Sequence, residues 1–185
     1  MVLPVVKYGD PILRKKGATV PAITPEIKKL VKDMLETMYD AHGVGLAAQQ
    51  VGKALQVTVI DVSGVTDRPS TMEIGGKEVD VKNHMPVTLI NPEVKATGKP
   101  VAGPEGCLSF PEIYADISRS ETVDVKALDE NGEVVQFSCG GLLARAVQHE
   151  VDHLNAILFI DRMTKVDKLE LKEQLEEIRN SKGED

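Results

Sequence analysis

Two histidines four residues apart, His149 and His153, lie in a segment of helical apolar spacing that spans residues 141–155. On an α-helix, side chains four positions apart share one face, with Cβ atoms roughly 5 to 6 Å apart. Two imidazoles in this arrangement can bind one metal ion. The chain has only four histidines, so this spacing favours a metal site over a surface helix that carries histidines by chance.

Glu150 directly follows the first of these histidines. It is predicted to face water at the open position of the metal site rather than to bind the metal, which suits a general base. The alternative is an ordinary solvent-facing glutamate. Asp152 is expected on another face of the helix, where it orients a neighbour or stays solvated, and it is assigned no catalytic role.

A catalytic metal site of this kind needs a third protein ligand, and Cys107 offers a thiolate. It lies in the run EGCLS at residues 105–109, where Gly106 lets a second group approach closely. Taken alone, a metal ligand and a buried small thiol are equally good interpretations of Cys107. Two cysteines are too few for a disulfide framework, and Cys139, in a β-branched stretch, is predicted to be a buried strand thiol.

A third feature is the run GVGLAAQQ at residues 43–50, which is predicted to be a loop after a helix. It does not fit a phosphate-binding loop, because no strand precedes it and no Gly-Lys-Ser/Thr ending follows. Its small residues would let an extended substrate backbone approach, and the amide of Gln50 would donate a hydrogen bond to a developing oxyanion. A tight loop packed under a sheet is the structural alternative.

The remaining pattern alternates helices and strands without a linker that would divide the chain. A first helix is predicted at residues 24–41, with Thr24 as its N-cap and Gly43 as the left-handed residue that closes it. A last helix is predicted at residues 166–180, and the polar segment 63–86 is expected to be a long loop or a small hairpin. Antiparallel strands are predicted at residues 55–60, 87–90, 122–128 and 134–137.

Composition excludes several classes of protein. The 185 residues carry a net charge of −7, and 42% of them are hydrophobic, which is ordinary for one compact domain. Only 3% are aromatic, so the basic patches and stacking platforms of nucleic-acid binders are missing and no direct nucleic-acid role is expected. No stretch approaches the roughly 20 apolar residues of a membrane span. A cytoplasmic protein without a membrane segment is therefore predicted.

The three runs together resemble the motifs of the peptide deformylases: a glycine loop ending in Gln, an EGCLS run and a QHExDH run. They occur here in that order, at residues 43–50, 105–109 and 148–153. Each motif alone is weakly specific, whereas the three in order are highly specific. The segment 63–86 looks longer than in the shortest family members, but no motif position is altered.

The resemblance implies a metalloenzyme. Cys107, His149 and His153 would hold one divalent metal ion, and Glu150 would carry the proton to the leaving amine. Ligand chemistry alone permits zinc, iron, nickel or cobalt, while the resemblance implies ferrous iron in the cell, with Zn2+, Ni2+ or Co2+ as substitutes.

The resemblance also implies how substrate would be held. Gln50 and the backbone N–H of Leu108 would stabilise the oxyanion, and Gly45 would help to pair with the substrate backbone. An apolar pocket would take the methionine side chain. Its implied wall residues are Val44, Leu142 and Ala146.

We therefore expect an α+β fold, with antiparallel sheets packed around a central metal-binding helix and with an N-terminal and a C-terminal helix. Residues 1–185 would form a single catalytic domain that removes the N-formyl group from formylmethionyl nascent peptides and releases formate. Two alternatives are a zinc peptidase of the His-Glu-x-x-His type, with Asp161 as the nearby third ligand, and a non-enzymatic metal-binding module, which would need neither Glu150 nor Gln50.

Some deformylases dock on the ribosome with a basic C-terminal helix. Here, residues 164–185 carry five cations against seven anions, which predicts no such docking.

Overall fold

The structure, a computed structural model, describes residues 1–181 and belongs to the expected α+β class. The strands are β1 (Gly45–Ala47), β2 (Val57–Ile60), β3 (Ser70–Ile74), β4 (Lys77–Val79), β5 (Val87–Ala96), β6 (Pro100–Cys107), β7 (Phe110–Ser120), β8 (Thr122–Leu128) and β9 (Val134–Gly141). The α-helices are α1 (Pro25–Asp40), α2 (Leu142–Leu154), α3 (Lys165–Glu170) and α4 (Lys172–Asn180). The short 3-10 helices are η1 (Pro11–Arg14), η2 (Ala48–Val51), η3 (Val81–His84) and η4 (Phe159–Arg162).

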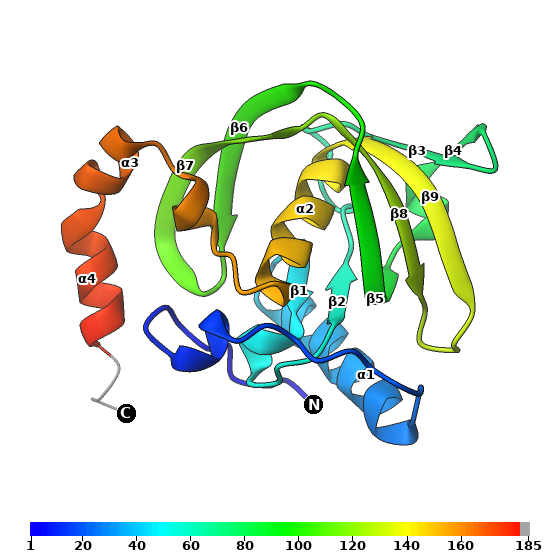
Figure 1. The fold of residues 1–185 in the computed structure, drawn as a ribbon, viewed down its shortest axis with the longest axis horizontal. Coiled ribbons are helices and arrows are strands. Elements are labelled where there is room, and N and C mark those ends of the chain that lie inside the picture. The colour runs from blue at the N-terminus through cyan, green and yellow to red at the C-terminus, as the bar shows by residue number, and fades with distance from the viewer. Residues whose placement is uncertain (182–185) are drawn as a thin grey trace.

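Helix α2 lies at the centre of the fold, between the large sheet and the β6–β7 hairpin (Figure 1). The large sheet has seven strands in the order β1-β2-β5-β8-β9-β3-β4, and all its neighbouring strands are antiparallel. The apolar stripe of α2 is fully buried, with Leu143, Val147 and Leu154 at 0% exposure. The helix that carries the two histidines is therefore an interior element, as its apolar spacing indicates.

The four predicted strands are present, but the hairpin that carries Cys107 was missed. Strand β8 has the predicted bounds, while β5 and β9 extend further than predicted. The sequence of β6, PVAGPEGC, contains two glycines and two prolines, so its own strand propensity is poor. It forms because it pairs along its whole length with β7, from Pro100 opposite Ser120 to Cys107 opposite Phe110.

The loop prediction for residues 43–50 is wrong in detail. The segment forms the edge strand β1, which pairs with β2 through Gly45 opposite Ile60, and then the 3-10 helix η2. Leu46 and Ala47 are fully buried. Small residues here let the chain pack closely between α1 and α2, and backbone pairing with β2 then overrides their weak strand preference.

Helix α1 begins as predicted but ends at a different residue. The Thr24 hydroxyl accepts a hydrogen bond from the Ile27 N–H at 3.3 Å, which makes Thr24 the N-cap. The left-handed residue after the helix is His42, with φ 56°, and not Gly43. Gly43 is needed for space instead, because a Cβ there would lie 2.9 Å from Cδ1 of Leu108.

The segment 63–86 contains a small hairpin, β3–β4, which joins the large sheet through β9. Its first strand also supports the central helix. The Pro69 carbonyl accepts a hydrogen bond from the Leu142 N–H, and the Ser70 hydroxyl accepts one from the Leu143 N–H, both at 3.0 Å. These are two of the N–H groups that have no partner within an α-helix. The segment thus caps α2 rather than being a detached loop.

The predicted last helix is divided at Leu171 into α3 and α4, of which α4 lies against the outer side of β7 (Figure 1). Leu175 is buried with Leu171 and Ile178 beside it, in a cluster shared with β7 and η4. The apolar residues of the predicted helix, Leu169 included, are expected to pack against the domain, but the side chain of Leu169 is 74% exposed. Leu169 lies two, six and nine positions from Leu171, Leu175 and Ile178, so helical geometry places it on the opposite face from these packed residues. Residues 182–185 of the predicted domain lie outside the described residues.

Candidate active site

Cys107 at the end of β6 meets His149 and His153 of α2 in the middle of the fold. Each of the three residues offers one ligand atom, and these three atoms lie within 4.8 Å of one another. The Cys107 Sγ lies 3.4 Å from Nε2 of His153. One thiolate and two imidazoles fit a mononuclear divalent metal ion with a further position open to water or substrate. Asp161 is not in the cluster but pairs with Arg14, which removes the third ligand that a peptidase of this type would need.

The two histidines are held differently. Nδ1 of His149 lies 2.8 Å from Oε1 of Glu105, so Nε2 of His149 is the ring nitrogen that is free to bind a metal ion. Burial opposes the charged form of His149, but Cys107 and Glu105 outweigh it and raise its pKa to about 10. A metal ion held by His149 would take the place of that proton. His153 is 1% exposed, and burial lowers its pKa well below the usual value, which keeps the imidazole neutral as a ligand must be.

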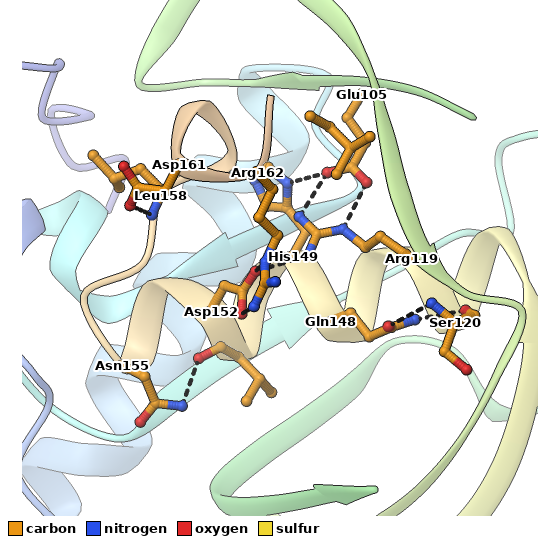
Figure 2. Close-up of polar contacts among 12 residues, drawn as sticks. Glu105, Arg119, Ser120, Gln148, His149, Asp152, Asn155, Leu158, Asp161 and Arg162 are labelled. Carbon is orange, nitrogen blue, oxygen red and sulfur yellow. Dashed lines mark hydrogen bonds and ion pairs between the residues drawn. The ribbon is translucent and has the colours of Figure 1, made fainter. Parts of the chain in front are cut away.

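Glu105 connects the His149 ring to two buried arginines, of which Figure 2 labels Arg119. Arg119 donates to both carboxylate oxygens, at 2.7 and 2.8 Å, and Arg145 donates to Oε2 at 2.9 Å. Burial alone would raise the pKa of Glu105, but its hydrogen bonds with His149 and Arg119, and their charges, lower it to about 2. A permanently ionised Glu105 therefore orients His149.

The network extends to the surface through Asp152. Arg119 donates to its carboxylate at 2.7 Å, and Arg162 of η4 donates to it at 2.5 and 2.9 Å (Figure 2). Of the two sequence interpretations of Asp152, orientation of a neighbour is the correct one. Sequence reasoning missed the arginines, because they lie far from the motifs along the chain and no local pattern marks them.

Glu150 lies beside the metal cluster without a polar partner. Its side chain is 5% exposed, and Oε2 has no hydrogen bond within residues 1–181. Burial raises its pKa to about 7, a value suited to accepting and releasing a proton near neutral pH. Gly45 makes room for it, since a Cβ at that position would lie 2.7 Å from Oε1 of Glu150. The sequence interpretation of Gly45 did not foresee this contact.

The amide of Gln50 has a fixed orientation. Its Oε1 accepts a hydrogen bond from the Ala47 N–H at 3.0 Å. Its Nε2 donates to the Ser109 hydroxyl at 3.1 Å and points to Cys107 Sγ at 3.5 Å. Because the oxygen is already occupied, the donor side of the amide faces the site. The backbone N–H of Leu108 has no hydrogen-bond partner among residues 1–181, while its carbonyl accepts from Lys7 at 3.1 Å.

A pocket of about 480 Å³ opens onto this cluster. On one side it is bounded by the β6–β7 hairpin and on the other by the segment around β1 and the start of α2. His153 is buried behind it. The sequence-predicted residues that line the pocket are Val44, Gly45, Gln50, Cys107, Leu108, Leu142, Ala146, His149 and Glu150. Cys139, by contrast, lies away from the site in β9, 3% exposed, and burial raises its pKa to about 12.

A partly buried cysteine and two buried imidazoles beside a carboxylate of raised pKa, at the floor of an open pocket, define a metal-dependent hydrolase. The chain belongs to the polypeptide deformylase family, whose family model matches residues 2–169. It is therefore an enzyme that removes the N-formyl group from nascent chains.

Individual relatives cover nearly the whole chain. A peptide deformylase of Methylacidiphilum infernorum is 48% identical over 99% of this chain and 96% of its own length. The crystal structure of a peptide deformylase from Legionella pneumophila has a TM-score of 0.82 and 32% identity, and covers 100% of this chain and 99% of the other. The crystal structure of the peptide deformylase from Ehrlichia chaffeensis has a TM-score of 0.84 and 33% identity, and covers 98% of this chain and 97% of the other. The similarity thus extends over both sheets and the helices.

Proposed function

We propose that Cys107, His149 and His153 hold the metal ion of this deformylase and that Glu150 transfers the proton. The observation that carries the proposal is the convergence of the three ligand atoms within 4.8 Å beside a buried, unpartnered carboxylate. A divalent ion bound there supplies Lewis acidity toward the formyl oxygen and water. Glu150 takes a proton from the attacking water and delivers it to the amine that leaves, and formate is released.

The remaining roles are assigned to residues that line the pocket. Nε2 of Gln50 and the N–H of Leu108 would donate hydrogen bonds to the oxygen of the tetrahedral species. β1 is an edge strand of the described sheet, so an extended substrate backbone can pair with it at Gly45. The methionine side chain would contact the apolar pocket wall, formed by Val44, Leu142 and Ala146.

The experiment that tests this function compares peptides that differ only in the formyl group. The enzyme is expected to release formate from formyl-Met-Ala-Ser and to leave Met-Ala-Ser intact. Cleavage of an internal peptide bond would instead indicate a peptidase, and no turnover with bound metal would indicate a binding module.

We further propose ferrous iron as the ion used in the cell, on the strength of the family resemblance. A soft thiolate with two imidazoles also accepts Zn2+, Ni2+ and Co2+, so these ions should substitute. Activity after chelation and anaerobic reconstitution with each ion, measured at equal occupancy, distinguishes them. Higher activity with Zn2+ than with Fe2+ would contradict the proposal.

Gln50→Ala is expected to lower kcat about a hundredfold or more with a smaller change in KM, because its amide donates to charge that develops only in the transition state. Leu108→Met is the matched control, since it keeps the backbone N–H and should be mild. Steady-state kinetics on a formylated tripeptide measures both. A change confined to KM would show that Gln50 only binds substrate.

We place the protein in the cytoplasm, where nascent chains are made. No helix among the described residues is both long and apolar enough to cross a membrane. Transient proximity to the ribosome follows from the substrate, while a docking role for the C-terminal helices is not favoured by their charge. Glu173, Glu176 and Glu177 form an acidic surface on α4, which would repel RNA phosphates.

Truncation before Leu169 is expected to lower the melting temperature but to leave ribosome affinity nearly unchanged at near-physiological salt. The stability loss follows from removing Leu175, since truncating a buried leucine to alanine alone costs about 2 to 5 kcal/mol. Leu175→Ala and the exposed Leu169→Ala form a matched pair, of which only the first should destabilise. Thermal melts and ribosome co-sedimentation measure the two effects. A large, salt-dependent loss of ribosome binding would refute the prediction.

A further inference from the structure

Arg68 lines the same pocket as Glu150 and His149, although it comes from the segment 63–86 and from none of the three motifs. It is half-buried. Its position is set by the residues that follow it, because Pro69 and Ser70 cap the first turn of α2 and Ser70 pairs with Gly141. The backbone next to Arg68 is thus hydrogen-bonded to the start of the helix that carries His149 and His153.

The guanidinium of Arg68 has no ionic or hydrogen-bond partner within residues 1–181. The arginines at 14, 119, 145 and 162 all pair with carboxylates, and Arg179 is exposed. Arg68 is therefore the half-buried arginine without a counter-ion in the described part of the chain. Partial burial of an unpaired charge is unfavourable unless a ligand supplies the partner. A guanidinium presents a planar set of donors that matches a carboxylate.

The charges around the pocket indicate which ligand group would bind. Glu105 is neutralised by its two arginines, and Lys7 and His42 also line the pocket. Glu112, exposed on the β7 side, is the carboxylate of the pocket rim. The formylated end of the substrate carries no charge, so only its side chains and its far end can attract a cation. Because the chain has a net charge of −7, it repels acidic groups, and a local cation is needed to bind one.

We propose that Arg68 is a specificity-determining residue that binds an acidic side chain on the residue next to the formylmethionine. The inference rests on the proposed function, since Arg68 shares the pocket with Val44, Leu142 and Ala146, which are assigned there to the methionine side chain. A carboxylate one residue further along the substrate would meet the side of the pocket that Arg68 lines.

The test uses three peptides with amidated C-termini: formyl-Met-Glu-Ser, formyl-Met-Gln-Ser and formyl-Met-Lys-Ser. For the metal-loaded wild-type enzyme, kcat/KM should be about fivefold higher with Glu than with Gln, mainly through KM, and this preference should shrink as salt is raised. Arg68→Gln should abolish the preference, and Arg68→Glu should reverse it in favour of the Lys peptide. Lys77→Gln, an exposed cation of the same segment outside the pocket, is the control and should keep the wild-type order.

The outcomes separate this inference from the proposed function. Failure of the wild-type enzyme to deformylate any of the peptides would contradict the function itself. Equal kcat/KM for the Glu and Gln peptides in the wild type, or an equal loss on all three peptides in Arg68→Gln, would overturn only the role of Arg68. The equal loss would indicate a contact with the substrate backbone. Reversal by Arg68→Glu is the readout that a merely structural role would not produce.

Discussion

Replacing Glu150 with glutamine is expected to leave the metal in place and to lower kcat at least about a hundredfold. The carboxylate contributes no ligand atom to the metal cluster, so occupancy should not change. Its function is to exchange a proton, for which burial raises its pKa to about 7. Glutamine keeps the size of the side chain but cannot accept that proton, and a lost general base typically costs 10²- to 10⁴-fold.

Metal content and steady-state kinetics measured on one preparation check this prediction. Glu133→Gln, an exposed glutamate before β9, is the matched control and should keep both properties. Activity retained together with the metal would exclude Glu150 as the proton carrier. If the metal were lost instead, Glu150 would have a structural role in the site.

Cys107→Ser is expected to abolish stoichiometric metal binding and, with it, activity. A serine hydroxyl is a poor ligand for a soft divalent ion and stays protonated near neutral pH, so the centre keeps only two imidazoles. The substitution is nearly isosteric, and Cys107 is only partly buried, so the fold should survive.

The loss of metal is measured by elemental analysis, which gives the metal-to-protein ratio. The loss of the thiolate ligand is measured by the charge-transfer absorption of the Co2+-loaded protein. Cys139→Ala is the control: that thiol is buried in β9, away from the ligand cluster, and its removal should leave both signals intact. Full occupancy in Cys107→Ser would contradict the ligand assignment.

Much of the site could be predicted from the sequence because its parts lie on short, regular segments. A four-residue spacing on a helix fixes two imidazoles on one face whatever surrounds them. The helix itself follows from its apolar stripe, and Thr24 likewise marks the start of α1 by its hydroxyl. These features depend on neighbours in the chain, so a single sequence contains them.

Other features were decided by contacts between distant segments. Strand β6 has poor strand propensity and exists through its pairing with β7, and that pairing is what carries Cys107 to the histidines. The burial of Leu175 likewise depends on a distant segment, because α4 packs against β7.

The sequence by itself determined the central helix and the shared face of His149 and His153, because spacing and apolar periodicity are local properties. The resemblance to a family added the expected α+β class, and the roles of Cys107 and Glu150 stay predictions. Only the tertiary structure decided that Gly45 makes room for Glu150 and that Glu105 orients His149 through two buried arginines. It also decided that Arg68 lines the pocket. These residues are separated by tens of positions, and their proximity depends on strand pairing and core packing, which local patterns do not encode.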